Sequence, residues 1–221
     1  MTNGSFSYRI NEIFYSLQGE GYHSGTPSVF VRFSGCNLRC PFCDTAHSDY
    51  EELTEAEIVR RVIAYPARHV VLTGGEPTLQ ITGSLCRALQ HEGRFLAVET
   101  NGLRNLIAAD CGQKPNVRLR EAVDWITCSP KDGFGLPNEN MPDSSAGKVV
   151  PLSEADELKV VFTDTSSEFL HRIEMLRKQF DARHYFLQPC SCGNTDEVVA
   201  YILRHPWWRL SLQTHKLIDI K

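Results

Sequence analysis

The 221-residue chain lacks an excess of basic residues, a long apolar run and an apolar start. Its 23 lysine and arginine residues are outnumbered by 27 aspartate and glutamate residues, so we expect no basic surface for nucleic-acid phosphates. No apolar stretch approaches the ~20 residues of a membrane span, and the opening MTNGSFSYRI lacks the apolar region of a secretory signal. We therefore expect a cytoplasmic protein that acts on a small molecule, with neither a nucleic-acid nor a membrane partner.

Eight cysteines stand out against this background. In a small secreted protein they would indicate disulfides, but in a chain of 221 residues whose start lacks the apolar region of a secretory signal they favour metal binding or redox chemistry. Three of them, Cys36, Cys40 and Cys43, fall within eight residues. The other five are scattered: Cys86, Cys111, Cys128, Cys190 and Cys192.

Short apolar runs of strand length alternate with helical patterns along the chain. The predicted strands are Val29–Phe33, His69–Thr73, Phe95–Glu99, Asp124–Cys128, Leu158–Phe162, His184–Gln188 and Arg209–Gln213. The predicted helices are Thr54–Tyr65, with a capping box of Thr54 and Glu57, Ile81–Glu92, Ser166–Phe180 and Thr195–Arg204, capped by Thr195. This alternation predicts an α/β fold of parallel strands, an incomplete (β/α) barrel with its helices outside.

We predict a single domain over residues 1–221, interrupted by a loop or insertion at residues 132–155 that is rich in Gly, Pro, Asn and Ser. The unusual residues follow the predicted strands. They are Cys36–Cys43, Gly74–Pro77, Glu99–Gly102, Ser129–Lys131, Gln188–Pro189 and Gln213–Lys216. Active sites of barrels and open α/β sheets are built at the carboxyl ends of strands, so we expect these segments to converge on one pocket.

The loop Cys36-Asn-Leu-Arg-Cys40-Pro-Phe-Cys43 supplies three thiolates, which are soft ligands that favour zinc or an iron–sulfur centre. A structural zinc site is normally closed by four ligands, whereas a cubane cluster held by three thiolates keeps one iron open. A zinc site completed by His47, or cysteines that only pack, stays open as an alternative.

The pairing of this loop with Gly74-Gly75-Glu76-Pro77 resembles the radical S-adenosylmethionine (SAM) superfamily, which carries C-x3-C-x2-C after its first strand and a GGEP-like segment after its second. The resemblance implies a barrel of the radical SAM type and a [4Fe–4S] cluster on Cys36, Cys40 and Cys43. It also implies S-adenosyl-L-methionine on the open iron, cleaved to a 5′-deoxyadenosyl radical. Glycine there lets the backbone approach the cofactor, and Glu76 offers a carboxylate to its ammonium group.

Further segments resemble the 7-carboxy-7-deazaguanine synthase family over nearly the whole chain. They are NEIFYSLQGEG at residues 11–21, VRFSGC at 31–36, CDT at 43–45, TGGEP at 73–77, SPK at 129–131 and LQTHK at 212–216. The resemblance implies a radical ring contraction of 6-carboxy-5,6,7,8-tetrahydropterin to 7-carboxy-7-deazaguanine with loss of ammonia. That reaction belongs to the route to 7-deazapurines such as queuosine, and Mg²⁺ assists it.

Site residues follow from the same resemblance. Residues 8–28 form an N-terminal substrate segment, in which Glu20 accepts hydrogen bonds from the aminopyrimidinone ring. The other substrate-binding residues are Leu17, Gln18, Gly19, Arg32, Thr73 and, through its terminal carboxylate, Lys221. The cofactor-binding residues are Phe42, Cys43, Asp44, Gly75, Glu76, Ser129, Pro130, Lys131 and Gln188. Glu20, Glu99 and His215 are the catalytic candidates, and Thr45 contacts Mg²⁺.

Plainer interpretations stay open for several of these residues. Gln18 and Gly19 suit an ordinary turn, Arg32 a surface salt bridge, Thr45 a helix cap, Lys131 a solvated surface and His215 a structural role. Cys111, Cys128, Cys190 and Cys192 could ligate an auxiliary cluster, but their spacing fits no auxiliary-cluster motif, and free cysteines are commonly inert and buried.

Two other functions compete with the synthase. A glycyl-radical enzyme activase shares the cysteine spacing, and a zinc-stabilised binding module for RNA or protein represents a different class. For the synthase we expect a flavodoxin-like or ferredoxin-like electron donor and a homodimer, in which residues 132–155 serve as a lid or a dimer element.

Overall fold

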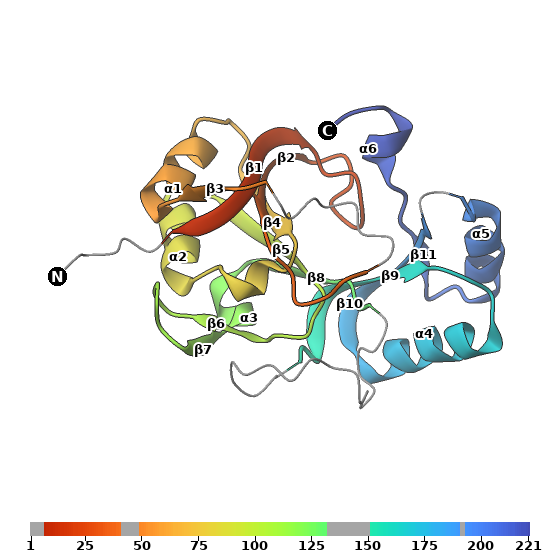
Figure 1. Ribbon diagram of the computed structural model, residues 1–221. Helices are drawn as coiled ribbons and strands as arrows, with labels where there is room; N and C mark the ends of the chain where they lie inside the picture. Colours follow the sequence, from red (N-terminus) through yellow and green to blue (C-terminus); the bar gives the residue numbers. More distant parts are fainter. Residues whose placement is uncertain (1–6, 41–48, 132–150, 191–192) are drawn as a thin grey trace. The chain divides into compact units, whose positions relative to one another are not determined.

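The computed structural model describes residues 7–40, 49–131, 151–190 and 193–221 (Figure 1). The chain forms two compact units. Unit 1 comprises Met1–Ser16, Pro27–Thr100 and Arg104–Ile126, and unit 2 comprises Leu17–Thr26, Asn101–Leu103 and Thr127–Lys221. The predictions for Phe42, Cys43, Asp44, Thr45, His47 and Cys192, and for most of the 132–155 loop, lie outside the described residues.

Unit 1 is built on a sheet in the order β5 (Phe95–Thr100), β4 (His69–Gly74), β2 (Pro27–Phe33), β1 (Tyr8–Leu17) and β3 (Glu51–Leu53). Strand β4 pairs in parallel with β2 and β5, and β3 runs antiparallel to β1. The middles of β2, β4 and β5 are apolar and buried, as expected for strands covered on both faces. A separate antiparallel pair joins β6 (Leu106–Ala108) and β7 (Pro115–Arg118).

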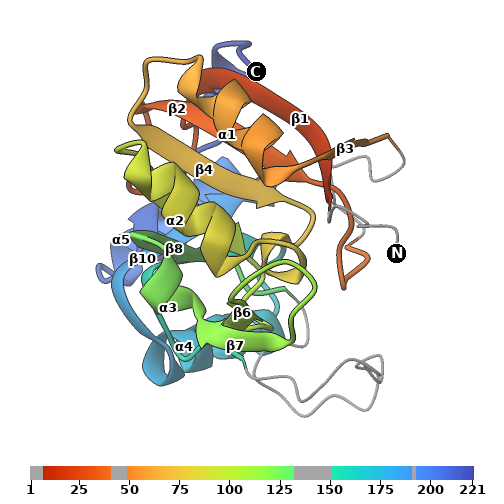
Figure 2. The same cartoon turned by 90° about the vertical axis from the view of Figure 1, so that its left-hand side faces the viewer.

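Helices α1 (Glu55–Ile63) and α2 (Gly83–His91) lie side by side over β4 (Figure 2). Helix α1 begins at the predicted capping box: the Thr54 hydroxyl accepts from the Glu57 amide at 3.4 Å, and the Glu57 carboxylate accepts from the Thr54 amide at 2.8 Å. Helix α2 is capped by Thr82, which accepts from the Leu85 amide at 3.1 Å. The short helices η1 (Pro77–Leu79) and α3 (Leu119–Ala122) complete the unit.

Unit 2 is built on the parallel strands β8 (Trp125–Cys128), β9 (Glu154–Phe162), β10 (Asp181–Pro189) and β11 (Arg209–Leu210), paired in that order. Trp125 and Ile126 of β8 are counted with unit 1, and β8 pairs with β9 through Thr127 and Cys128. Helices α4 (Ser167–Gln179) and α5 (Thr195–Arg204) pack against β10 (Figure 1), and the short α6 (Thr214–Leu217) lies near the C-terminus.

These elements confirm the predicted α/β arrangement of mostly parallel strands with helices. In the main sheet of each unit, the described strands pair in a row whose two end strands do not pair with each other. Nowhere in the described ranges is a helix long and apolar enough to cross a membrane. Strands β1, β3, β6 and β7 were not predicted. Strand β11 stops at Leu210, and β9 begins at Glu154, inside the predicted loop.

The predicted cap of α5 is wrong by one residue, because Asn194 and not Thr195 occupies the N-cap position. The Asn194 side chain makes no capping bond. Its amide oxygen accepts from the Cys190 amide at 3.0 Å, and its amide nitrogen donates to the Phe162 carbonyl at 2.9 Å. Asn194 therefore ties the start of α5 to the ends of β9 and β10.

Candidate active site

The cysteine loop leaves the carboxyl end of β2 in unit 1, through Gly35 with a φ of +94°. Cys36 and Cys40 are partly exposed reduced thiols. The Leu38 amide donates a hydrogen bond to the Cys36 sulfur at 3.4 Å. An amide donor to sulfur stabilises a thiolate and tunes iron–sulfur centres, so Cys36 fits the predicted cluster; Cys43 lies outside the described residues.

The Gly-Gly-Glu-Pro segment lies directly beside this loop. The Gly75 amide donates to the Phe33 carbonyl and the Glu76 amide donates to the Gly35 carbonyl, each at 2.9 Å. Gly74 has a φ of +112°, and a Cβ built on it would lie 2.3 Å from the Phe33 carbonyl oxygen. The structure thus brings the two segments together at the ends of β2 and β4, and only glycine fits at Gly74.

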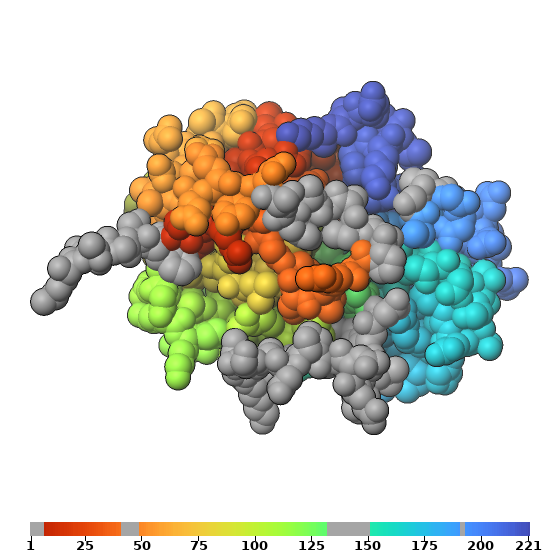
Figure 3. Space-filling view, viewed as in Figure 1, coloured from red at the N-terminus to blue at the C-terminus, as the bar shows by residue number. Residues whose placement is uncertain are grey.

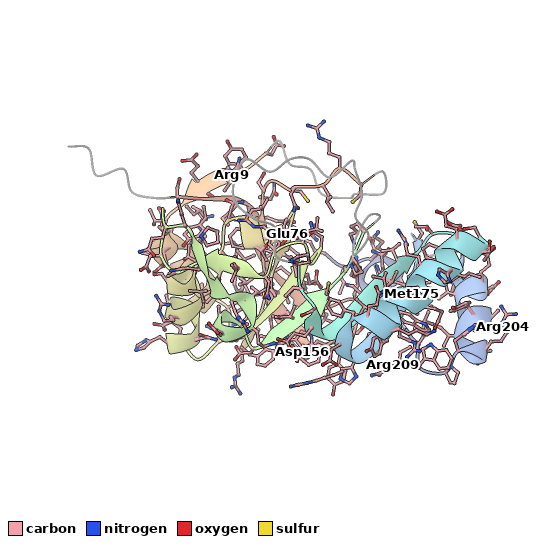
Figure 4. All side chains as sticks on the ribbon, turned by 90° about the horizontal axis from the view of Figure 1, so that it is seen from below. Arg9, Glu76, Asp156, Met175, Arg204 and Arg209 are labelled. Carbon is pink, nitrogen blue, oxygen red and sulfur yellow. The ribbon has the colours of Figure 1, made fainter. Side chains whose placement is uncertain are left out.

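The Glu76 side chain, labelled in Figure 4, is fully buried. One carboxylate oxygen accepts from the Thr78 amide at 3.1 Å, the Thr78 hydroxyl at 2.6 Å and the Thr100 hydroxyl at 2.7 Å. Glu76 therefore caps η1 as well as standing in the expected cofactor segment. The sequence did not predict Thr78 and Thr100 as the hydrogen-bond donors to Glu76. A carboxylate buried beside an apolar strand does, however, require hydrogen-bond donors of this kind.

We expect Thr100→Val to lower the free energy of unfolding by about 2 kcal/mol, because it removes a hydroxyl donor from a buried carboxylate while keeping the side-chain shape. Urea denaturation followed by circular dichroism measures this change. Thr100→Ser keeps the hydroxyl and should recover most of the loss. A Thr100→Val protein as stable as the wild type would show that the hydrogen bond to Glu76 makes no measurable contribution at this position.

Three predicted residues lie in a row across neighbouring strands of unit 1. Arg32 on β2 is the register partner of Thr73 on β4, and the Thr73 hydroxyl donates to Glu99 on β5 at 2.9 Å. On the other side, the Arg32 guanidinium lies 3.3 Å from the Glu12 carboxylate and 5.5 Å from the centre of the Phe14 ring, both on β1. The row presents a cation, a hydroxyl and a carboxylate, a set suited to a polar substrate.

A second group of predicted residues lies in unit 2. The loop Leu17–Thr26 is closed by hydrogen bonds from the Gln18 amide to the Thr26 carbonyl at 2.8 Å and from the Gly25 amide to the Gln18 carbonyl at 2.7 Å. The His215 ring packs on Gly19: a Cβ built on Gly19 would lie 2.1 Å from His215 Nδ1. The Gly19 carbonyl also accepts from the Thr214 amide at 2.9 Å. The LQG and QTH segments, distant in sequence, are therefore in contact.

Glu20 is the most strongly held carboxylate of this group. Its side chain is only 14% exposed, forms an ion pair with Lys159 on β9 and accepts from the Gln213 amide nitrogen at 2.9 Å. Burial raises the pKa of Glu20, but the Lys159 ammonium and the hydrogen bonds from Lys159 and Gln213 outweigh burial and hold that pKa at about 2. Glu20 is thus a permanent anion at neutral pH, and its pairing with Lys159 was not predicted.

The remaining predicted residues of unit 2 are placed as follows. Lys131 donates to the Ser129 hydroxyl at 2.8 Å, and Pro130 between them is buried. Gln188, near the end of β10, is buried and its amide oxygen accepts from the Ser211 hydroxyl at 3.1 Å. Lys221 is exposed in the C-terminal region, which forms the dark-blue surface in Figure 3. The structure places each of the two groups of site residues within its own unit, and the prediction that both share one pocket stays a prediction.

Cysteines outside the loop provide a contrast. Cys86 and Cys128 are fully buried, and burial raises the pKa of the Cys86 thiol to about 12. Cys111 makes a hydrogen bond with Tyr8 at 3.2 Å. A thiol that stays protonated is a poor metal ligand, so Cys86 is a structural residue.

The comparisons with known proteins agree with this picture. A model described as the Radical SAM superfamily matches residues 30–133. A 7-carboxy-7-deazaguanine synthase of Bacteroides thetaiotaomicron is 48% identical over 213 residues, covering 96% of this chain and 98% of the relative. One from Haemophilus influenzae is 33% identical, covering 97% and 95%. The crystal structure of QueE from Escherichia coli superposes with a TM-score of 0.71 at 27% identity, covering 95% of both chains.

Proposed function

The chain belongs to the 7-carboxy-7-deazaguanine synthase family of the radical SAM superfamily, and from this premise we propose that it converts 6-carboxy-5,6,7,8-tetrahydropterin to 7-carboxy-7-deazaguanine with loss of ammonia. The observation that carries the proposal is near-full-length identity of 48% to a synthase of that name. Such names support the synthase over a glycyl-radical enzyme activase or a zinc-stabilised module. The product belongs to the route to 7-deazapurines such as queuosine.

The cluster ligands in this proposal are Cys36, Cys40 and Cys43. When bound, the cluster supplies the electron that cleaves S-adenosyl-L-methionine and yields the 5′-deoxyadenosyl radical. The chain's own part begins with geometry: the Gly75 amide donates to Phe33 at the end of β2, and the Glu76 amide donates to Gly35, which immediately precedes Cys36. These bonds fix the start of the cysteine loop against the Gly-Gly-Glu-Pro segment.

Cofactor binding is assigned to the segments that follow β4, β8 and β10. Gly75 lets the backbone approach the cofactor, and Glu76 offers a carboxylate to its ammonium group. Ser129, Pro130, Lys131 and Gln188 are assigned as further cofactor-binding residues. Phe42, Cys43 and Asp44 lie against its adenine. The hydrogen bond between Lys131 and Ser129 supports this assignment because it orders the SPK segment.

Substrate binding is assigned to both groups of residues. Arg32 pairs with the substrate carboxylate, since a guanidinium suits two-point pairing, and its ion pair with Glu12 holds it in place. Thr73, Leu17, Gln18, Gly19 and Lys221 contact the pterin. Glu99, which accepts from Thr73, is proposed to hydrogen-bond the cofactor ribose or the substrate, and His215, which packs on Gly19, to hydrogen-bond the substrate or shuttle a proton.

Magnesium is proposed to bind beside the cluster, with the Thr45 hydroxyl as a ligand, because hard cations prefer oxygen donors. We expect Thr45→Ala to retain the cluster but to lose stimulation by Mg²⁺. Turnover measured with and without added Mg²⁺, with iron content as the control, tests this. A variant stimulated as strongly as the wild type would remove Thr45 from the magnesium site.

The setting of the reaction completes the proposal. We propose a cytoplasmic homodimer reduced by a flavodoxin-like or ferredoxin-like protein. The direct test of the activity is anaerobic incubation of the reconstituted protein with reductant, S-adenosyl-L-methionine, Mg²⁺ and the carboxytetrahydropterin. We expect 7-carboxy-7-deazaguanine by mass spectrometry. Intact substrate alongside an active cluster would refute the assignment.

A further inference from the structure

Strand β9 carries three buried charged residues: Asp156, which forms an ion pair with Arg183 at 3.2 Å, Glu157 and Lys159. Glu157 and Lys159 are 2% and 4% exposed, and as residues i and i+2 of a strand they face the same side. A buried charge is costly unless it is paired and hydrogen-bonded, so each needs a partner. Both find it in the Leu17–Thr26 loop, which lies within the predicted substrate segment of residues 8–28.

The two residues hold neighbouring parts of that segment. The Glu157 carboxylate accepts from the Tyr22 amide at 2.8 Å, and a Cβ built on Gly21 would lie 2.1 Å from one of its oxygens. The Gly21 amide donates to the Ser211 hydroxyl at 3.0 Å. The backbone on the carboxyl side of Glu20 is thus fixed, which leaves Lys159 to act on the Glu20 side chain.

The contacts of Glu20 leave it spare acceptor capacity. A carboxylate has roughly four lone-pair positions on its two oxygens. Lys159 donates to one oxygen, and the Gln213 amide nitrogen donates to the other at 2.9 Å. The orientation of that amide is fixed in turn, because Lys216 donates to its oxygen at 3.1 Å. With 14% of its side chain exposed, Glu20 remains able to accept further hydrogen bonds from a ligand.

We propose that Lys159 is a positioning residue for the substrate, which with Gln213 keeps Glu20 a fixed, ionised acceptor for the N–H donors of the aminopyrimidinone ring. The proposal rests on the proposed function, which supplies that ring. Its amino group and ring N–H are adjacent donors, and an ionised carboxylate is the side chain that accepts two such bonds at once. Lys159 acts through Glu20 and does not itself contact the reacting atoms.

The charges around Glu20 set the sign of its pH dependence. Lys159 and Glu157 face it from β9, His215 faces it from α6, and Lys216 lies beyond Gln213. Burial raises the pKa of Glu20 and Lys159 lowers it, with a net result of about 2. Because the pKa of Glu20 is lower in the folded than in the unfolded protein, ionised Glu20 stabilises the folded state at pH values above the unfolded-state pKa. This stabilisation is lost as the pH falls towards 2. Between pH 6 and 9, therefore, Glu20 does not titrate in the wild type.

Removing the Lys159 charge while keeping its length reverses this balance. In Lys159→Met, burial is no longer opposed by the ammonium, so the pKa of Glu20 rises above its usual range. We expect substrate affinity, relative to the wild type at the same pH, to fall about tenfold per pH unit below that new pKa. Equilibrium dialysis of the carboxytetrahydropterin between pH 6 and 9 measures it, using protein loaded with cluster, S-adenosyl-L-methionine and Mg²⁺ without reductant.

Matched variants separate this role from simple support of the fold. Lys159→Arg keeps the charge and should follow the wild-type profile. Glu157→Gln weakens the anchor of the same segment but leaves the charge on Glu20, so any loss of affinity should be independent of pH. In a Glu20→Gln background, Lys159→Met should change affinity less than twofold, since its target is already neutral. The double variant buries no unpaired charge and so covers the case in which Lys159→Met alone does not fold.

The outcomes are distinct. A pH-dependent loss confined to Lys159→Met, absent in the Glu20→Gln background, supports the proposal. A loss that is independent of pH, or that persists undiminished in the Glu20→Gln background, overturns it. Failure of the wild-type protein to bind the pterin at all would instead reject the proposed function.

Discussion

Cys40→Ala is expected to lose the iron–sulfur cluster and all turnover together. Three thiolates are the minimum that holds a cubane while leaving one iron open, and the loop supplies no fourth cysteine to replace Cys40. Iron and acid-labile sulfide should fall from about four per chain to near zero after anaerobic reconstitution, and the visible absorption of the cluster should disappear. Product and 5′-deoxyadenosine should both drop below detection.

The matched control is Cys86→Ala. Cys86 is fully buried in α2 and the pKa of its thiol is raised to about 12, so it stays protonated and binds no metal. This variant should keep full cluster content and lose only a modest amount of stability. A Cys40→Ala protein that retained a reducible cluster, or a Cys86→Ala protein that lost one, would place the centre elsewhere in the chain.

Gly74→Ala should be the most damaging single-methyl change in unit 1. The φ of Gly74 is +112°, and the added Cβ would meet backbone at 2.3 Å from the Phe33 carbonyl oxygen and 2.5 Å from its amide nitrogen. Backbone cannot rotate away as a side chain does, so the ends of β2 and β4 must separate. We expect the free energy of unfolding to fall by about 3 kcal/mol and cluster occupancy to fall with it.

Gly93→Ala calibrates that effect. Gly93 also has a positive φ, +73°, but a Cβ there would meet no atom within 4 Å. It should therefore cost only the backbone strain, about 1 kcal/mol, and leave the cluster intact. Thermal unfolding together with iron analysis compares the two. If Gly74→Ala were as mild as Gly93→Ala and bound a full cluster, the close join between the cysteine loop and the Gly-Gly-Glu-Pro segment would be wrong.

The parallel strands were predictable because they are covered on both faces, so that their apolar runs are unbroken, as in His69–Thr73. Strand β1 was not, although Tyr8 and Ile10 are buried and Arg9 between them is exposed. That alternation is a strand signal, but it breaks off after Ile10, because Asn11, Glu12 and Ile13 are all partly buried. The β6–β7 pair is short, with three residues in β6 and four in β7, and strands of that length carry little periodicity to detect.

The site divides along similar lines. Residues near the strand ends, such as Arg32, Thr73 and Glu20, were predicted because motif and position agree. Glu12 beside Arg32 and Lys159 beside Glu20 were not predicted, and neither was Thr100 beside Glu76, because these pairings are determined by three-dimensional neighbours rather than by spacing. Lys159 did leave one signal: it is a lone charge in the otherwise apolar run Leu158–Phe162, and such a charge must be paired. Asking for its partner would have pointed to a buried carboxylate.

The central claim is that Cys36, Cys40 and Cys43 hold a cluster with one iron available to S-adenosyl-L-methionine. Electron paramagnetic resonance of the dithionite-reduced protein, recorded before and after addition of that compound, tests it most directly. A reduced [4Fe–4S] signal that changes its g values on addition is the expected result. A protein that contains only zinc, or a cluster whose spectrum is indifferent to S-adenosyl-L-methionine, would contradict the account.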